Sequence, residues 1–585
     1  MPITQKKSVN GKIWQQKSVN EHDVLELCRN LRISDFLAKI LLPRLENIAH
    51  AGNFLSPKIK NLLIDPFHLL DMQKAVDRAI EAIIKKQKIC IFADYDVDGA
   101  TSSSLLKNVF RDLGHKADIY VPDRIAEGYG PTAFAMQKIK DTGAQLIITV
   151  DCGAMAFDAL KYAKEVGLEV IVIDHHISGD ILPEAVAVVN PNRIDETSPY
   201  KYLAAVGVSF LFATALLADL KKQNYFVSIP VPNLMQYLDL VALGTVCDVM
   251  KLINLNRAFV TQGLKIMTQR KNIGIATLYD LAGLNEKPNC YHLGFMLGPR
   301  INAGGRVGKS SLGANLLSTT CRVEASKLAE ELEKHNNERK VIEITMIEEA
   351  MKIALSQEND SSLFIIGKGW HPGVIGIVAG RLKEKFNKPV AVIALNDGMG
   401  KASCRSIKNV DFGSKILNAK VQDLVIVGGG HAMAAGFTVA EDKLFALQTF
   451  LNEAFKNDIN NLQDHGEEYD VELTTSGVNL EIMAELQQLE PFGQGNPEPM
   501  FKFSDLYVLK ADILVGKHIK CLLVPSKEAY GSKPLTAIAF NAVSSPIENV
   551  LLNPRAYNLA VIGSLKVNNW KEKYTIQLQI KDLII

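Results

Sequence analysis

The sequence predicts an α/β protein in which a large parallel-sheet domain is joined by a long helix to a smaller α/β domain and a β-rich C-terminal domain. From about residue 60 to residue 318, short apolar runs alternate with amphipathic helical patterns, which is typical of a parallel sheet covered on both faces. Residues 322–355 are rich in Glu, Lys, Arg and Ala and contain no Gly or Pro, which predicts one long helix. After residue 460, short alternating runs separated by Gly and Asn turns predict a β-barrel or a sandwich.

The length of 585 residues predicts three or four domains, at roughly 150 residues each. Residues 1–55 contain polar and helical patterns without identifiable chemistry, and we treat them as an extension. The expected order is therefore an N-terminal extension (1–55), the parallel-sheet domain (56–320), the connecting helix (321–358), the smaller α/β domain (359–460) and the β-rich domain (461–585).

Composition excludes several classes of protein. The formal net charge is +1, so any surface that binds nucleic acid must be a local patch of Arg and Lys. The eight cysteines form no C-x-x-C pair, which argues against a disulfide framework and a zinc site. Met1 is followed by a polar segment rather than the apolar core of a signal peptide. The apolar stretch from Ala204 to Leu220 is interrupted by Gly, Ser and Thr, so we expect a buried helix rather than a membrane span, in a cytoplasmic protein.

The strongest indication of a functional site lies in the parallel-sheet domain, directly after its first predicted strand, which ends near Phe92. Asp94, Asp96 and Asp98 alternate in the next segment, and in an extended strand they would share one face. Three neighbouring carboxylates repel one another unless a cation lies among them, and hard oxygen ligands suit Mg2+ or Mn2+. The alternative is a solvated turn rich in Asp and Gly.

Two further strands end in residues of the same kind. The apolar run 146–150 is followed by Asp151, and the run 170–173 by Asp174, His175 and His176. Because the carboxyl ends of parallel strands meet at one edge of a sheet, these side chains are expected to converge. Asp248, after a long apolar stretch, is a fourth candidate, although a helix cap is the alternative there. Together these segments predict a site for divalent metal ions.

These motifs resemble a known family. Residues 94–102 (Asp-Tyr-Asp-Val-Asp-Gly-Ala-Thr-Ser), 151–153 (Asp-Cys-Gly) and 174–176 (Asp-His-His) resemble the first three motifs of the DHH phosphoesterases, and Asp248 lies where the fourth is expected. Gly428-Gly429-Gly430-His431 is similar to the glycine-rich signature of the associated DHHA1 domain. The blocks at 298–306, 370–376, 403–406 and 491–497 resemble the bacterial branch of this family that degrades single-stranded DNA. The resemblance extends over nearly all of the chain after about residue 50.

The resemblance implies a DHH catalytic domain, a DHHA1 domain and a C-terminal OB-fold, which binds single strands through a basic groove and stacking aromatics. It also implies two divalent ions, Mn2+ or Mg2+, bound by Asp94, Asp96, Asp98, Asp151, His175 and Asp248. Asp174 is expected to orient a neighbouring histidine. Whether His176 binds a metal or contacts the scissile phosphate stays open. So does the assignment of each Asp to one metal, because the first motif lacks the His found in many DHH proteins.

The resemblance further implies that Arg124, Arg300, Ser403 and Arg405 bind a terminal 5'-phosphate or the adjacent backbone, a task that suits bidentate arginines. Arg124 is expected in a loop after a strand, and Arg300 and Arg306 in a loop rich in Gly and Asn; a solvated surface charge is the alternative for each. The glycines around Gly429 are expected to form a tight turn whose N–H groups approach phosphate, with His431 beside the substrate. Trp370 either stacks a base or lies in the core.

The leading interpretation is a metal-dependent 5'→3' exonuclease that degrades single-stranded DNA to 5'-mononucleotides in recombination and repair, supplied by a helicase and a single-strand-binding protein. One alternative is a DHH phosphoesterase acting on short oligonucleotides, cyclic dinucleotides or pyrophosphate; the C-terminal β-rich domain argues against it. Another is a non-catalytic DNA-binding scaffold, which predicts eroded metal ligands, whereas all the expected ligands are present in this sequence.

Overall fold

The computed structural model describes residues 6–124, 126–461, 466–525, 533–570 and 573–585. They form two compact units. The larger unit contains Pro66–Asp248 and Gly263–Asp464, and the smaller one contains Met1–Asp65, Val249–Gln262 and His465–Ile585. Each unit is described by itself.

The larger unit begins with a five-stranded parallel sheet in the order β3-β2-β4-β5-β6. Its central strands are short runs of β-branched and other apolar residues, buried on both faces as a parallel sheet requires. The strands are β2 (Ile89–Ala93), β3 (Ala117–Tyr120), β4 (Leu146–Val150), β5 (Glu169–Ile173) and β6 (Ala187–Val189). This confirms the parallel sheet that the alternating pattern predicts.

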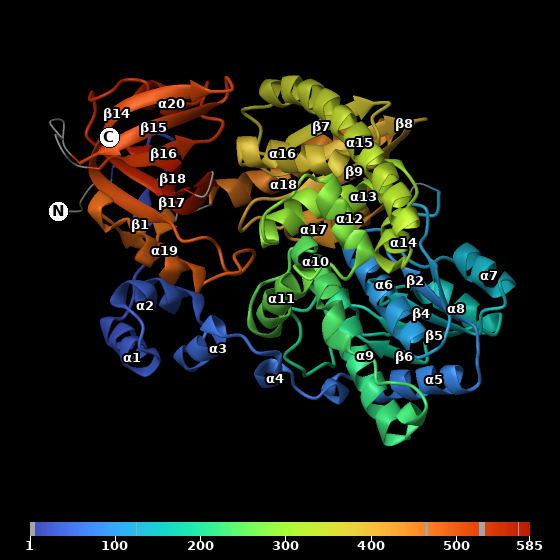
Figure 1. Cartoon of the computed structure of the whole chain (residues 1–585). Helices are drawn as coiled ribbons and strands as arrows, with labels where there is room; N and C mark the ends of the chain where they lie inside the picture. The colour runs from blue at the N-terminus through green and yellow to red at the C-terminus, as the bar shows by residue number, and fades with distance from the viewer. Residues whose placement is uncertain (1–5, 125, 462–465, 526–532, 571–572) are drawn as a thin grey trace. The chain divides into compact units, whose positions relative to one another are not determined.

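Helices cover both faces of this sheet (Figure 1). On one face, α7 (Ala133–Asp141) and α8 (Phe157–Glu165) pack on side chains of β2, β4 and β5. On the other lie α5 (Met72–Ile84), α6 (Val97–Asp112) and α9 (Ala205–Lys222), in contact with one another or with the strands. The predicted buried helix is α9, which is apolar on nearly all sides. In the described part of the chain, no helix combines the length and apolar composition needed to cross a lipid bilayer.

A helical layer leads from this sheet to the second one. Its members are α10 (Leu238–Cys247), α12 (Ile273–Leu281), the π-helical segment η6 (His292–Leu297), α13 (Gly298–Val307), α14 (Leu312–Ser318) and α15 (Arg322–Ser356). Most of α11 (Asn254–Met267) belongs to the smaller unit. The predicted connecting helix is confirmed as α15, which has 35 residues (Figure 1). Its buried residues contact α12, α13 and α14 along its first half and α16 and β7 further along.

The second sheet has the order β10-β11-β9-β8-β7, in which only β7 and β8 are parallel. Its strands are β7 (Leu363–Lys368), β8 (Val390–Asn396), β9 (Met399–Arg405), β10 (Val427–His431) and β11 (Ala434–Ala440), with helices α16 (Ile375–Phe386), α17 (Phe412–Val421) and α18 (Leu444–Asn460). Cores on the two faces contain α16 on one side and α17 and α18 on the other. This is the smaller α/β domain that the sequence predicts.

The smaller unit is built around a closed five-stranded barrel, which decides between the barrel and the sandwich. Neighbouring strands pair in the circle β14-β15-β16-β18-β17 and back to β14, with β16 and β18 parallel. These are β14 (Phe501–Leu514), β15 (His518–Val524), β16 (Leu535–Ala539), β17 (Leu559–Trp570) and β18 (Lys573–Ile584), and α20 (Pro546–Leu551) follows β16. The order of strands and helix is that of an OB-fold.

The N-terminal segment completes this unit. Strand β1 (Trp14–Gln16) pairs with β12 (Glu467–Tyr469), and β13 (Val471–Glu472) extends the barrel beside β14. Helices α1 (Glu21–Leu31) and α2 (Asp35–Leu41) and the short α3 (Ala51–Leu55) share an apolar core with α19 (Leu480–Gln487) and the barrel strands. The remaining short helix there is α4 (Ile59–Leu62).

Three local predictions are wrong. Asp94, Asp96 and Asp98 do not continue a strand: β2 ends at Ala93, and Asp98 lies in the first turn of α6. Arg300 and Arg306 lie in α13 rather than in a loop, because packing against α15 overrides the poor helix propensity of the Gly residues. Gly428–His431 is an edge strand rather than a tight turn, because β11 supplies its hydrogen-bonding partners.

Candidate metal centre

The first aspartates lie where β2 passes into α6. The side chain of Asp96 caps this helix: its Oδ1 accepts hydrogen bonds from the N–H groups of Asp98 (2.8 Å) and Gly99 (3.1 Å). Gly99 is required by the tight turn, since a Cβ atom there would lie 2.3 Å from the carbonyl oxygen of Asp94. Capping and close packing therefore bring the carboxylates of Asp94 and Asp96 together, although they do not share a strand.

Asp98 is held from a different direction. It is 1% exposed, and its two carboxylate oxygens accept hydrogen bonds from the N–H groups of Ala205 (2.7 Å) and Val206 (3.0 Å). These N–H groups belong to the first turn of α9, whose positive dipole end favours an anion. Asp98 thus fixes α9 against α6 while its carboxylate remains part of the cluster.

Asp151 follows β4 with φ +62°, in the left-handed region that side chains other than Gly rarely adopt. Gly153 follows with φ +112°, and a Cβ atom there would lie 2.6 Å from Oγ1 of Thr149. The chain therefore turns sharply at the end of the strand and holds the Asp151 carboxylate over the sheet edge. Strained backbone of this kind persists where the surrounding structure enforces it.

His175 is oriented by a backbone carbonyl. Its Nδ1 lies 3.1 Å from the carbonyl oxygen of Leu203, which can only accept, so Nδ1 carries the proton and Nε2 keeps its lone pair. Nε2 lies 3.3 Å from Asp151 Oδ1 and 3.5 Å from Asp248 Oδ2. Burial and the charge of His176 lower the pKa of His175 to about 4, which keeps it neutral as metal binding requires. Nothing in the sequence pattern points to Leu203, because a backbone carbonyl carries no residue signature.

Asp174 positions the second histidine. Its Oδ1 lies 2.8 Å from Nδ1 of His176, and its carboxylate also accepts the N–H groups of Ala154, His175 and His176. Burial alone would raise the pKa of Asp174, but the hydrogen bond and charge of His176 lower it to about 2. Asp174 is thus fully occupied by protein donors, which fits the orienting role expected of it.

The predicted ligands converge into three overlapping groups, within each of which the ligand atoms lie within 4.8 Å of one another. Asp151 and His175 each belong to two groups, and Asp248, directly after α10, belongs to one. The groups are Asp94–Asp96–Asp151, Asp151–His175–His176 and Asp98–His175–Asp248. Two adjacent cation sites that share Asp151 are the simplest interpretation of this overlap.

The chemistry of these side chains fits divalent cations. Asp94 Oδ1, His175 Nε2 and Asp248 Oδ2 are buried and have no hydrogen-bond partner, which is costly unless another ligand satisfies them. Burial and then the charges of neighbouring carboxylates raise the pKa values of Asp94, Asp98, Asp151 and Asp248. A raised pKa favours the protonated carboxyl group, and a bound cation reverses this preference. Mixed carboxylate and imidazole ligands suit Mn2+, and the carboxylates alone suit Mg2+.

A positively charged region of the same unit lies around Arg306. Arg306, on α13, donates a hydrogen bond to the carbonyl oxygen of Gly373 (3.0 Å). Burial and the nearby charges of Arg124, Arg339 and Arg405 lower the pKa of Arg306 to about 10. Buried positive charges that repel one another favour an anion among them. The structure therefore brings the predicted Arg124, Arg306 and Arg405 together.

The remaining phosphate-binding candidates, Ser403, Arg405, Gly429 and His431, share one face of the second sheet. Ser403 and Gly429 both pair with Gly436, and Arg405 and His431 both pair with Ala434. Residues opposite one another, or two apart on a strand, point to the same face. Helix α16 passes close to this face, since a Cβ atom on Gly376 would lie 3.0 Å from Ser403 Oγ and 3.3 Å from Arg405 Nη2.

Two candidates already have partners in the protein. The guanidinium of Arg300 forms an ion pair with Glu333 (2.6 Å) and donates to the carbonyl oxygen of Met296 (2.6 Å), so a phosphate would have to compete for it. Trp370 is 6% exposed, and its Nε1 donates to Glu349 (2.7 Å). Trp370 is therefore a core residue rather than a platform for a base.

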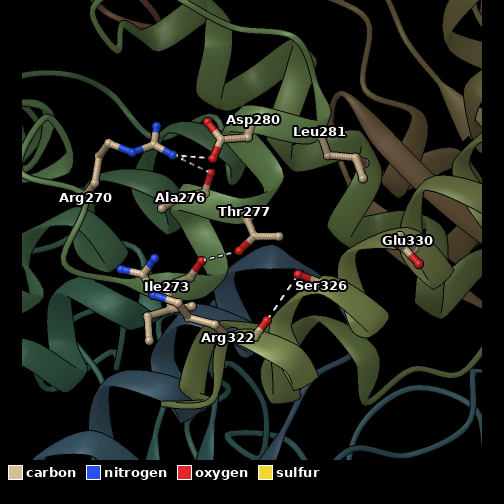
Figure 2. Close-up of a pocket in the computed structure, with 9 residues that line it drawn as sticks. All are labelled: Arg270, Ile273, Ala276, Thr277, Asp280, Leu281, Arg322, Ser326 and Glu330. Carbon is tan, nitrogen blue, oxygen red and sulfur yellow. Dashed lines mark hydrogen bonds and ion pairs between the residues drawn. The ribbon is translucent and has the colours of Figure 1, made fainter.

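A separate cavity of about 530 Å3 lies between α12 and α15 (Figure 2). At its edge, the guanidinium of Arg270 pairs with the carboxylate of Asp280 at 2.5 Å and donates to the carbonyl oxygen of Ala276. None of the metal or phosphate candidates lines this cavity.

Three protein families match successive parts of the chain. The DHH family N-terminal domain matches residues 88–245, the DHHA1 domain matches residues 359–457, and the RecJ OB domain matches residues 469–582. These ranges cover, in turn, the parallel sheet with all predicted metal ligands except Asp248, the second sheet, and nearly all of the barrel. The fold is thus a DHH domain, a long connecting helix, a DHHA1 domain and an OB-fold barrel.

Curated relatives match over almost all of the chain. The single-stranded-DNA-specific exonuclease RecJ of Bacillus subtilis is 33% identical over 98% of this chain and 71% of that protein. RecJ of Escherichia coli is 35% identical over 90% of this chain and 92% of that protein. The crystal structure of RecJ from Thermus thermophilus in complex with Mn2+ has a TM-score of 0.80 and 27% identity, over 97% of this chain and 79% of that one. The structure of the same protein with Mg2+ has a TM-score of 0.74 and 25% identity, over 98% and 78%. The chain belongs to the RecJ family.

Proposed function

We propose that this protein is a metal-dependent exonuclease that degrades single-stranded DNA from the 5' end and releases 5'-mononucleotides. The observation that carries the proposal is the buried cluster of carboxylates and imidazoles with unsatisfied Asp94 Oδ1, His175 Nε2 and Asp248 Oδ2. It occurs in a chain of the RecJ family, whose named members act on single-stranded DNA. The sequence resemblance supports the polarity and the place in recombination and repair.

Two Mn2+ or Mg2+ ions would supply an activated water and stabilise the leaving oxygen. The residues proposed to hold them are Asp94, Asp96, Asp98, Asp151, His175 and Asp248. Asp174 keeps His176 in a fixed orientation, and burial, which would lower the pKa of His176, is outweighed by that carboxylate, which raises it to about 9. His176, held in this orientation by Asp174, is proposed to contact the scissile phosphate.

The positively charged region of Arg124, Arg306 and Arg405, called the arginine-rich region from here on, supports recognition of a 5'-terminal phosphate. Burial and the nearby charge of Arg124 lower the pKa values of Arg306 and Arg405, and a bound anion would relieve the repulsion among these guanidinium groups. Ser403, Gly429 and His431 share a sheet face with Arg405 and are proposed to contact the same nucleotide. Arg300 would contact this phosphate only after the phosphate displaces Glu333 from its ion pair with Arg300.

Arg405→Ala is expected to weaken the preference for a 5'-phosphate more than cleavage itself. The loss of one charge-assisted contact corresponds to about tenfold in relative kcat/KM. The measurement compares phosphorylated and dephosphorylated strands, with the exposed Lys408 (Lys408→Ala) as control. Equal preference in the Arg405 variant and the unaltered protein would contradict the assignment.

The barrel supports binding of an extended strand rather than of a dinucleotide alone. We also propose that a helicase and a single-strand-binding protein supply the substrate in the cytoplasm. The domain boundaries at 56–320, 359–460 and 461–585 stay a proposal, supported by the ranges of the three family matches.

The test is digestion of a long strand labelled at one end, with Mn2+ and with chelator. A 5' label should appear in mononucleotides at once, and a 3' label should shorten progressively. Duplex DNA and dinucleotides are the comparison substrates. Faster cleavage of dinucleotides than of long strands would favour a small-molecule phosphoesterase, and binding without any cleavage would favour a scaffold.

A further inference from the structure

Tyr95 lies between two proposed metal ligands, Asp94 and Asp96, and has had no role so far. Its backbone packs against α13: a Cβ atom on Gly305 would lie 2.9 Å from the carbonyl oxygen of Tyr95, 3.3 Å from its Cβ and 3.6 Å from its Cδ2. Gly305 precedes Arg306 of the arginine-rich region. Tyr95 thus lies within the segment from Asp94 to Asp96, which we call the metal loop, and packs against α13, the helix that carries Arg306.

The ring of Tyr95 also holds Arg124. The Cζ atom of Arg124 lies 4.9 Å from the ring centroid, within the range of a cation–π contact. An arginine held by an aromatic ring keeps its N–H donors for a ligand, unlike Arg300, whose donors contact Glu333. Tyr95 is therefore a support for Arg124 that leaves its phosphate-binding capacity intact.

On its other side Tyr95 meets Tyr129, which leads to His176. The Tyr95 and Tyr129 rings lie edge to face with centroids 6.4 Å apart, and Tyr129 and His176 do so at 6.0 Å. The Tyr129 hydroxyl lies 3.4 Å from His176 Nε2 and 3.4 Å from the carbonyl oxygen of Asp151. A continuous aromatic row thus joins Arg124 to His176.

We infer that Tyr95 is a positioning residue that couples recognition of the 5'-terminal phosphate by Arg124 to the metal loop, and so fixes where the first phosphodiester lies relative to the metal ligands. The inference rests on the proposed function and adds a residue to it. Arg124 would bind the terminal phosphate only in the position that Tyr95 allows, and Tyr129 would hold His176 at a set distance from it.

The test replaces Tyr95 with Leu, which removes the ring's π-face, and with Phe, which keeps it. The measured quantity is the ratio of kcat/KM for 5'-phosphorylated over 5'-hydroxyl strands. Tyr95→Leu should lower this ratio about three- to thirty-fold, and Tyr95→Phe should change it by less than about twofold. In an Arg124→Ala background, Tyr95→Leu should lower the ratio no further, because both changes remove the same contact. Mn2+ binding should keep its stoichiometry.

The inference would be overturned by an unchanged ratio in Tyr95→Leu, by multiplying losses in the double variant, or by loss of Mn2+ binding in Tyr95→Leu. A protein without any preference for 5'-phosphate would overturn it too. A second measurement, which does not depend on cleavage, compares the affinities for 5'-phosphorylated and 5'-hydroxyl strands in the Asp151→Asn background. A protein that cuts no strand but shows the expected affinity ratios would contradict the proposed function and leave the inference standing.

Discussion

Asp151 is the residue on which the proposed metal centre depends most. It belongs to two of the three ligand groups, it lies 3.3 Å from His175 Nε2, and it adopts a left-handed backbone conformation. A residue that cannot be replaced by a neighbour and is held in a costly conformation is expected to be functional. Exposed aspartates of the same unit, such as Asp397 and Asp423, also adopt a left-handed backbone conformation but belong to none of the three ligand groups.

Asp151→Asn should abolish cleavage while strand binding persists. The amide keeps the size of the side chain but loses the charge, and several kcal/mol of metal-derived stabilisation correspond to a loss of about a thousandfold or more in kcat. Digestion of a labelled strand with Mn2+ gives the rate, and a gel-shift titration gives the affinity. Asp141→Asn, at an exposed end of α7, is the matched control. A large loss of affinity with only slightly reduced cleavage would contradict the assignment.

A different aspartate, Asp470, is expected to contribute to the response of the smaller unit to acid. Its carboxylate is 1% exposed and contacts Arg44 (2.7 Å), Lys17 (3.0 Å) and the N–H of Met500 (2.9 Å). Burial alone would raise the pKa of Asp470, but the hydrogen bond and charge of Arg44 lower it below its ordinary value. Its contribution to stability is therefore complete above the unfolded-state pKa of about 3.9 and is lost as pH falls through the folded-state value.

Asp470→Asn should destabilise the smaller unit by about 3–5 kcal/mol at pH 7, because Arg44 is left buried without its partner. The difference from the unaltered protein should shrink as pH falls below about 4, where the native carboxylate also becomes protonated. Denaturant unfolding at a series of pH values measures both effects. Glu467→Gln, which breaks an exposed pair with Lys12, is the control and should change stability little. A pH-independent difference would show that the carboxylate charge is not the cause.

At the scale of elements, the connection between β2 and α6 determines the conformation of the metal loop. The strand ends one residue before Asp94, and the helix begins one residue after its cap, Asp96. Gly99 lets the first turn of α6 approach the backbone of Asp94. The positions of Asp94 and Asp96 thus depend on the contact between two elements and not on strand alternation.

Gly99→Ala should therefore disturb the metal loop. The added methyl would meet the Asp94 carbonyl at 2.3 Å, and overpacking of this kind costs about 1–3 kcal/mol or shifts the loop. Mn2+ titration should show weaker binding, together with a lower unfolding midpoint. Gly380→Ala in α16, where a Cβ atom would meet nothing within 4 Å, is the control and should leave both quantities unchanged or slightly raise stability. Normal Mn2+ binding by the Gly99 variant would contradict this account of the loop.

The sequence predicts the helices and strands that have a clear apolar pattern better than the Gly-rich ones. Apolar runs such as β4 and the uninterrupted helical pattern of α15 are recovered because periodicity reports burial directly. The helix α13 and the strand β10 are not, because their Gly-rich sequences become regular only through packing on α15 and pairing with β11. The site residues are predicted as types at strand ends, but the shared role of Asp151 and the aromatic row from Tyr95 require three-dimensional contacts.

At the scale of the whole molecule, the chain contributes three separate segments to the smaller unit. Arg257, from the middle segment, donates to the carbonyl oxygens of Phe54, Leu489, Glu490 and Pro491. This buried guanidinium joins the N-terminal and C-terminal segments around one side chain. In the larger unit, the predicted metal ligands come from successive segments of the chain. Their carboxylates repel one another, and bound cations would remove this repulsion.

Mn2+ is therefore expected to raise the stability of the larger unit selectively. A cation at about 100 times its dissociation constant adds about 2.7 kcal/mol to the free energy of unfolding. Thermal unfolding of the full chain with Mn2+ and with chelator measures the shift, and Asp151→Asn should remove most of it. Asp470→Asn, in the other unit, should retain it. An equal response in both variants would mean that Mn2+ acts elsewhere.

Anomalous diffraction from crystals soaked in Mn2+ tests the central claim most directly. The account predicts two peaks, roughly 3.5–4 Å apart, one beside Asp94, Asp96 and Asp151 and the other beside His175 and Asp248, with Asp151 touching both. A single peak that does not contact Asp151, or no peak among these side chains, would contradict it.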